Sequence, residues 1–252
     1  MIRTRYAVPA LAAGAVAVMM SASTVVADDL VLIDTPATVL DTAVRGESEQ
    51  IRPLPSPQPP TARYRVTITQ TWDGSTHPGT LPPNPHTSPA VLAAHGRAGD
   101  LFAAGALASP GIELMAETGA IGTLRAELTA NPTVSDIDNG RGIDTDTTPD
   151  NDQLEVTVTQ QNALLSLVTM LAPSPDWFIG FSDVSVFGTN GWEQRIVLDL
   201  GNYDSGTDSG VGFTSGDIDT QPPQLISGPR DAPFQAAAGQ NRFGFAVIER
   251  IG

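Results

Sequence analysis

The feature that most constrains the fold is the alternation of apolar and polar residues in short segments. In "YRVTITQTW" (64–72), Tyr64, Val66 and Ile68 lie on one face of an extended chain, and polar residues lie on the other. A period of two residues is typical of a half-buried β-strand. Because "LEVTVTQ" (154–160) repeats this pattern, we expect antiparallel sheets that cover a shared core.

Further segments are rich in β-branched and aromatic residues. They are "DWFIGFSDVSVF" (176–187), "QRIVLDL" (194–200) and "RFGFAVIER" (242–250), which we predict to be strands. The apolar run "ALLSLVTML" (163–171) has a length that fits either a helix or a buried strand. The proline that follows Ala172, and the β-rich neighbouring segments, favour a strand.

Predicted helices are short and confined to the middle of the chain. "TSPAVLAAH" (87–95) offers Ser88 as an N-cap with Pro89 at the first helical position, and "GIELMAETG" (111–119) is long enough for about two turns. The polar stretch 133–153 reads as a long loop. Many short strands joined by Gly- and Pro-rich connections predict an all-β fold, an antiparallel β-sandwich with a few short helices in its connections.

The N-terminus has the three-part organisation of a secretory signal peptide. A basic start precedes an uncharged, mostly apolar run, and Val25 and Ala27 are the small residues that a cleavage site requires. We therefore expect 1–27 to be a signal peptide, cleaved after Ala27, and the mature protein to be secreted, periplasmic or on the cell surface. Residues 28–62 form an N-terminal arm that ends in a proline-rich linker, and 63–252 form the folded domain.

Charge excludes one class of partner. Loss of Arg3 and Arg5 with the leader leaves 11 basic residues, all arginine, against 28 acidic ones, a net charge of about −17. Such a surface repels phosphate backbones, so we expect no nucleic-acid partner. The chain has no cysteine, so disulfides and zinc–thiolate sites are excluded, and an exported domain must be held by its core, by a bound metal, or by both.

Enzymatic signals are weak. The three histidines, His77, His86 and His95, are spaced by nine residues, which fits neither one helical face nor a short chelating motif. No Gly-x-Ser-x-Gly elbow and no phosphate-binding loop with lysine is present. An exported metal-dependent hydrolase that uses this histidine region is therefore the alternative hypothesis.

The acidic stretch 136–152 also suggests calcium. It opens with "DIDNG", which resembles the start of an EF-hand loop, but the glycine comes one position early and no glutamate closes the loop at position twelve. A solvated loop of like charges is the favoured interpretation.

Three other aspartates form a better candidate metal site. Asp176 precedes a predicted strand, and Asp204 and Asp208 bracket a Gly/Ser turn that follows another. If these strands are antiparallel neighbours, the three carboxylates meet at one rim of the sandwich and repel one another unless a cation lies between them. Calcium, a hard ion that prefers oxygen ligands, is the expected occupant, and hydrogen-bonding turn aspartates are the alternative.

These stretches resemble the spondin domain family. The segments "YRVTITQTW", "PHTSPAVLAAH", "LASPGIELMAETG", "LSLVTMLAPSPDWFIGFSDVSVF" and "YDSGTDSGVGF" occur in the order of the family and cover residues 63 to about 215. Ser205 stands where the family usually has alanine, the cysteines of animal members are absent, and the 136–152 insert has no clear counterpart.

The resemblance implies an antiparallel β-sandwich of C2-like topology with a calcium ion at one end. Its motifs carry the ligand role onto Asp176, Asp204 and Asp208. It also implies a non-enzymatic protein that attaches to an extracellular protein or glycan, although the partner's identity does not follow from the sequence. We expect a secreted, calcium-binding adhesion or surface-binding module in which Trp177 fills the core under the site; a purely structural cell-envelope protein is a further alternative.

Overall fold

Two antiparallel sheets form the fold of the residues that the computed structural model describes, which are 58–77, 81–144, 151–228 and 243–252. The predicted signal peptide and nearly all of the predicted N-terminal arm lie outside these residues. The described residues all belong to the unit Leu54–Gly252.

The smaller sheet has four strands, in the order β10 (Arg195–Asp199), β12 (Gly244–Arg250), β1 (Thr61–Gln70) and β5 (Asn151–Thr159). In its register, Val66 of β1 lies opposite Ile248 of β12 on one side and Leu154 of β5 on the other. These three side chains are fully buried, so the alternating pattern of each strand faces the same core.

The larger sheet has six strands. Its main path is β11 (Gly201–Asp204), β7 (Trp177–Ser185), β6 (Leu164–Ala172), β3 (Val91–His95) and β4 (Val134–Asn139), and β2 (His86–Thr87) also pairs with β6. A separate two-stranded ribbon consists of β8 (Phe187–Gly188) and β9 (Gly191–Trp192).

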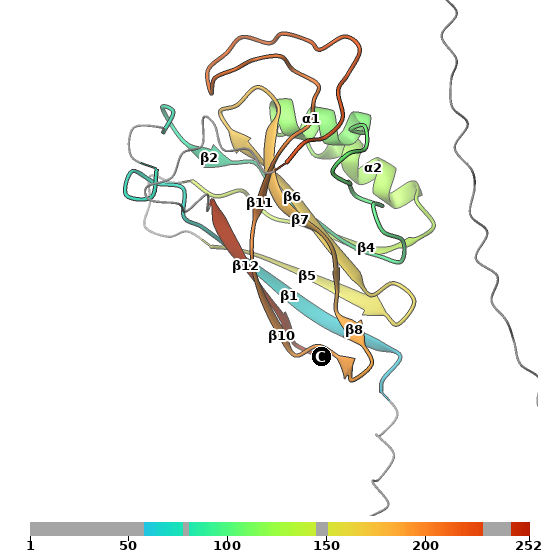
Figure 1. Ribbon diagram of the computed structural model, residues 1–252. Coiled ribbons are helices and arrows are strands. Elements are labelled where there is room, and N and C mark those ends of the chain that lie inside the picture. The colour runs from blue at the N-terminus through green and yellow to red at the C-terminus, as the bar shows by residue number, and fades with distance from the viewer. Residues whose placement is uncertain (1–57, 78–80, 145–150, 229–242) are drawn as a thin grey trace, which may run out of the picture. The chain divides into compact units, whose positions relative to one another are not determined.

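The larger sheet is buried on both faces. Its inner face packs against the smaller sheet, and its outer face packs against helices α1 (Pro110–Thr118) and α2 (Gly122–Ala130), as Figure 1 shows. On β3, Leu92 points into the core between the sheets, whereas Val91 points into the cluster under the helices.

The predicted fold class is confirmed: the described residues form an antiparallel β-sandwich with two short helices in its connections. The ambiguous run 163–171 is strand β6. The predicted helix at 111–119 is α1, which Ser109 caps by accepting a hydrogen bond from the Ile112 N–H and which ends at Gly119 in the left-handed region (φ 73°).

The helix predicted at 87–95 is wrong, because this segment forms β2 and β3. Ser88 does not cap a helix; its hydroxyl accepts a hydrogen bond from the Met170 N–H at 2.9 Å, across to β6. Every residue of β3 is buried. Burial on both faces removes the alternation that would have identified a strand, and tertiary packing outweighs the helix propensity of its alanines.

The long loop predicted at 133–153 is also wrong at both ends, since it contains β4 and the start of β5. Asp136 and Asp138 accept hydrogen bonds from the backbone N–H groups of Thr157 and Glu155, each at 2.8 Å. These carboxylates therefore link the edge of β5 to the other sheet. In an ordinary pair of strands, backbone carbonyls would accept these hydrogen bonds.

Candidate metal centre

The three predicted aspartates meet at one end of the larger sheet. Asp176 lies in the turn between β6 and β7, Asp204 ends β11, and Asp208 follows in the next loop. The antiparallel pairing of β7 with β11 places Asp204 opposite Trp177, one residue after Asp176. All three aspartates are buried, with exposed fractions of 0%, 6% and 7%.

Asp176 is bonded through one oxygen only. Its Oδ2 accepts hydrogen bonds from the Ser205 hydroxyl at 3.0 Å, the Thr207 N–H at 2.9 Å and the Asp208 N–H at 3.1 Å. Its Oδ1 is buried and has no hydrogen-bond partner. Among the described residues, it is the only carboxylate oxygen in that condition. A buried polar atom without a partner is costly, so this atom requires an explanation.

Asp204 and Asp208 organise the loop. Asp204 accepts from the Gly206 N–H through Oδ1 and from the Trp177 indole N–H through Oδ2, both at 2.9 Å. Asp208 accepts from the N–H groups of Gly210 and Ile218. Gly206 is at φ 77°, and a Cβ there would lie 2.5 Å from the Gln224 carbonyl oxygen, so only glycine fits this turn.

The donor set fits a hard cation, although the side chains do not yet enclose one. In the described part of the chain, no three His, Cys, Asp or Glu side chains form a metal-holding group as they stand. Asp176 nevertheless presents a free oxygen, and each bonded oxygen of Asp204 and Asp208 keeps acceptor capacity, because a carboxylate has about four lone-pair sites. Oxygen ligands of this kind suit calcium.

Trp177 fills the core under the site, as predicted, and also contacts one of the aspartates. It is 1% exposed within the core between the sheets, and its indole N–H orients the Asp204 carboxylate. Sequence reasoning identified its burial but missed the hydrogen bond.

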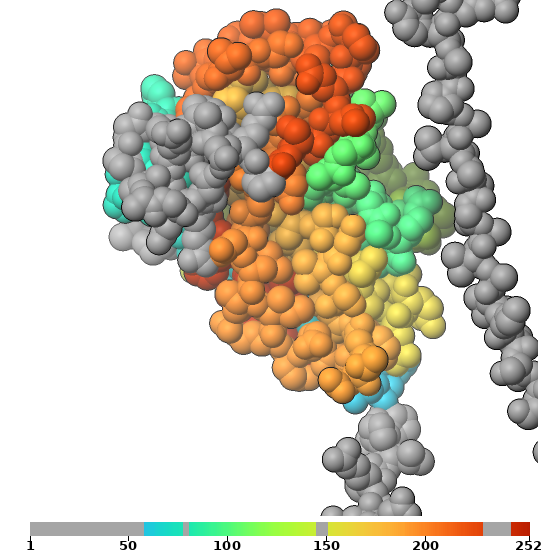
Figure 2. All heavy atoms as spheres, viewed as in Figure 1, coloured from blue at the N-terminus to red at the C-terminus, as the bar shows by residue number. Residues whose placement is uncertain are grey.

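An acidic residue that sequence reasoning missed lies beside the aspartates. Burial raises the pKa of Glu117, on α1; a hydrogen bond from the Thr207 side chain lowers it, and the charges of Glu113, Asp217 and Asp176 raise it further. The sequence places Glu117 in a predicted helix but gives no signal for which loop that helix would contact. Figure 2 shows the surface of α1 beside that of the segment after β11.

The histidines do not gather into a site. His77 is buried and packs on Phe243, with ring centroids 4.8 Å apart, whereas His86 lies on β2 and its Nδ1 is 2.9 Å from the Asn84 carbonyl oxygen. His95 is buried at the end of β3. The hydrolase hypothesis therefore finds no support in the described residues.

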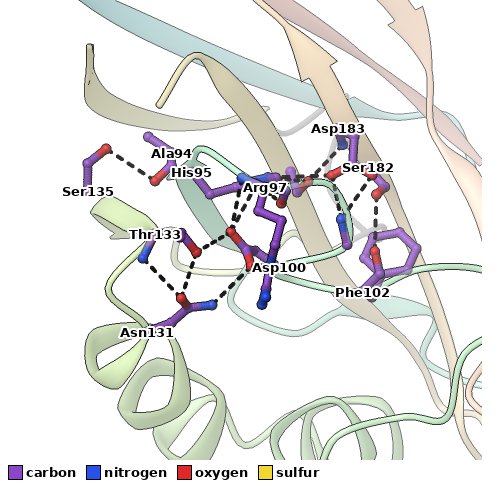
Figure 3. Close-up of polar contacts among 12 residues, drawn as sticks. Ala94, His95, Arg97, Asp100, Phe102, Asn131, Thr133, Ser135, Ser182 and Asp183 are labelled. Carbon is purple, nitrogen blue, oxygen red and sulfur yellow. Dashed lines mark hydrogen bonds and ion pairs between the residues drawn. The ribbon is translucent and has the colours of Figure 1, made fainter. Parts of the chain in front are cut away.

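His95 belongs to a separate polar network, which Figure 3 shows. Its Nε2 is 2.8 Å from the Ser166 hydroxyl, and its Nδ1 is 3.0 Å from the Arg97 carbonyl oxygen, a contact that assigns the proton to Nδ1. Asp100 and Asp183 lie at 3.8 Å from the two ring nitrogens. Although Ser, His and Asp occur together here, Ser166 is fully buried and accepts the Asp183 N–H at 2.8 Å, so the serine joins strands rather than facing a substrate.

The acidic insert does not form an EF-hand-like site in its described part. Asp136 and Asp138 bond the backbone of β5, and Asp152 accepts the N–H groups of Arg141 and Gly142 at 2.8 and 3.2 Å. At these positions the acidic side chains accept hydrogen bonds from the backbone, and they do not form the solvated loop that we expected. The remainder of the insert, 145–150, lies outside the described residues.

A search for membrane-spanning helices in the described residues finds no helix with the length and apolar character that a span requires.

Comparison with known proteins gives a consistent family. The family model Spondin_N matches residues 62–237. Spondin-1 of Gallus gallus is 32% identical over 176 residues, which cover 66% of this chain and 22% of that protein. Spondin-2 of Rattus norvegicus is 30% identical over 175 residues, which cover 67% of this chain and 52% of that protein. The alignments therefore span about a fifth of Spondin-1 and about half of Spondin-2.

Proposed function

The chain belongs to the Spondin_N family, and on that premise we propose that it is an extracellular, non-enzymatic adhesion-type protein whose β-sandwich binds calcium at Asp176, Asp204 and Asp208. The curated relatives are spondins, and the chain's own leader-like N-terminus supports export. The proposed partner is an extracellular protein or glycan. The chain that would bind it carries more acidic than basic residues.

The observation that carries the calcium proposal is the buried, unpartnered Oδ1 of Asp176. Its other oxygen already accepts three hydrogen bonds, so the side chain is fixed in place and cannot turn its free oxygen toward water. A hard cation beside this atom would satisfy it and would also reduce the repulsion from Asp204 and Asp208.

In this proposal the chain's residues have distinct tasks. Asp176 supplies the free oxygen, and Asp204 and Asp208 supply further carboxylate oxygens from the loop after β11. Trp177 holds Asp204 in orientation, as groups behind metal ligands commonly do. When bound, calcium would supply positive charge to a segment that has none of its own, because residues 201–228 contain no Lys, Arg or His.

Thermal unfolding with and without calcium tests the proposal. A ligand at a hundredfold excess over its Kd stabilises the folded state by about 2.7 kcal/mol. For a domain of this size that corresponds to a rise in Tm of roughly 5–10 °C. We expect this rise for the wild type, little or none for Asp176→Asn, and an almost unchanged rise for Asp217→Asn, an exposed carboxylate of the same loop region.

A wild-type Tm that is equal in saturating calcium and in chelator would refute the calcium site. The adhesion part is tested separately, by binding of the purified mature chain to glycan and matrix-protein arrays. Failure to bind either class in calcium would contradict it.

A further inference from the structure

The two edges of the smaller sheet differ in how their backbone groups are bonded. At one edge, aspartate side chains of β4 accept the backbone N–H groups of Glu155 and Thr157 on β5, each at 2.8 Å. At the other edge, β10 pairs with β12 alone within the described residues (Figure 1). An edge strand whose outward N–H and C=O groups are open can pair with a strand from another chain.

The register of β10 determines which of its residues face outward. The backbone of Gln194, just before the strand, and that of Leu200, just after it, each bond β12 at 3.0 Å. Because backbone groups alternate in direction along a strand, the N–H and C=O groups of Arg195, Val197 and Asp199 point away from β12. Outside the β10–β12 pairing, no hydrogen bond among the described residues involves the backbone of Arg195 or Val197.

The same three residues carry the exposed side chains of β10. Val197 is 48% exposed and lies between Arg195 and Asp199, which are also exposed. The alternate residues, Ile196 and Leu198, pack against the core between the sheets. The exposed face of this edge therefore reads positive, apolar, negative, and this order is complementary to itself when the strand is reversed.

We infer that β10 pairs with β10 of a second copy of this chain, antiparallel about a twofold axis at Val197. In this register Arg195 of each copy lies opposite Asp199 of the other, and the two Val197 side chains meet. Each of these pairs exchanges both of its backbone hydrogen bonds, because the groups that face outward on one strand face those of the other. A shift by two residues would lose the pairs of opposite charge, so the charges also select the register.

The dimer joins the two smaller sheets into one continuous sheet. It goes beyond the proposed function and does not depend on the calcium site. For an adhesion-type protein it would present two copies of any binding surface, which strengthens attachment to a surface that carries many ligands. The contact follows one short strand and both copies are acidic, so we expect the association to be weak.

Sedimentation velocity of the mature chain tests this inference. The range runs from about 5 µM to about 500 µM, because weak interfaces dissociate at lower concentrations. Salt at about 0.15 M shortens the Debye length to about 8 Å and so reduces the repulsion between the two acidic copies. We expect the wild-type sedimentation coefficient to rise with concentration from the value of a monomer to that of a dimer.

Two charge reversals test the register. Arg195→Asp and Asp199→Arg each turn both pairs of opposite charge into pairs of like charge, so we expect each variant alone to dimerise about tenfold more weakly. When the two variants are mixed in equal amounts, each introduced charge lies opposite its complement. The mixture should therefore associate within about threefold of the wild type.

Arg63→Asp is the matched control. Arg63 bonds Glu155 across neighbouring strands of the same sheet, as Arg195 bonds Glu249, and the two arginines are 58% and 56% exposed. Arg63 lies on β1, which is not an edge strand, so we expect its reversal to change dimerisation by no more than about twofold. Circular dichroism melts verify that each variant folds.

Each other outcome overturns the inference. A wild type that stays monomeric over the whole range would show that the edge does not accept a second copy, and a strand from a different protein would then be its only candidate partner. If the wild type dimerises and the single variants dimerise equally well, the dimer uses a different surface. If the single variants are monomeric and their mixture is monomeric too, the strands do not pair in this register.

Discussion

Two clusters of buried and partly buried polar groups in the described residues differ in how their hydrogen bonds are completed. The closed cluster consists of His95, Ser166, Asp183 and Asp100. The open cluster consists of Asp176, Asp204 and Asp208. Both contain carboxylates that the fold removes from water, and both join segments far apart in the sequence.

In the closed cluster each carboxylate meets donors from the chain itself. Asp100 accepts from Arg97 Nε at 3.0 Å and from the Thr133 hydroxyl at 2.6 Å, among others. Burial raises the pKa of Asp100, but hydrogen bonds from Thr133, Asn131 and Arg97 outweigh burial and hold it below its usual range. The ionised form is therefore stabilised within the fold, and no external ligand is needed.

In the open cluster one carboxylate oxygen has no partner and the surrounding charges are all negative. The free atom is Asp176 Oδ1, and the pKa of Glu117 is raised, first by burial and then by the charges of its acidic neighbours. Buried acidic residues therefore indicate a ligand only where the protein leaves their charge uncompensated.

The largest expected effect is in the closed cluster. His95→Ala removes a fully buried ring, and the Ser166 hydroxyl and the Arg97 carbonyl lose their hydrogen bonds to it. We therefore expect a loss of about 3 kcal/mol in the free energy of unfolding. Urea unfolding followed by circular dichroism measures it. The loss should be equal with and without calcium, and His86→Ala, on the short strand β2, should cost less than about 1 kcal/mol. A calcium-dependent loss for His95→Ala would break the separation of the two clusters.

An intermediate effect is expected for Asp100→Asn. Its amide would point at donors that the carboxylate now accepts, so we expect a loss of about 2 kcal/mol near neutral pH. Because the folded-state pKa lies below the ordinary value of 3.8, the wild-type advantage is complete above pH 3.8 and disappears as the pH falls through the lowered value. Unfolding at a series of pH values checks this, and an advantage that grows below pH 3.8 would contradict it.

The smallest effect is expected for the same substitution in the open cluster, measured in chelator. In Asp176→Asn the amide oxygen can keep the three hydrogen bonds of Oδ2, and the amide nitrogen takes the place of the unpartnered oxygen. We therefore expect the free energy of unfolding to change by less than about 1 kcal/mol. A loss as large as that of Asp100→Asn would show that Asp176 is compensated by the chain alone.

The sequence predicted the parts of the fold in which one face of a strand is buried. In β1, Tyr64, Val66 and Ile68 alternate with polar residues, and the structure buries all three. The sequence-based prediction failed for β3, which is buried on both faces. It also failed for β4, where Asp136 and Asp138 break the alternation because they accept hydrogen bonds from the backbone of another strand. Neither bonding across sheets nor packing under a helix leaves a periodic signal in the chain.

The candidate site was predictable to the same extent. Asp176, Asp204 and Asp208 follow or precede strands, so antiparallel pairing was enough to bring them together, as β7 and β11 do. The hydroxyl groups of Ser205 and Thr207 come together through the course of one loop, and the Trp177 indole reaches Asp204 from the neighbouring strand. These contacts are tertiary and could not be read from residue spacing.

The most direct test of the calcium site is a crystal structure of the mature chain grown in calcium, with the anomalous signal of the ion recorded. We expect one calcium ion within bonding distance of Asp176 Oδ1, with carboxylate oxygens of Asp204 and Asp208 among its ligands. A well-ordered site at saturating calcium that holds only water beside Asp176 Oδ1 would contradict it.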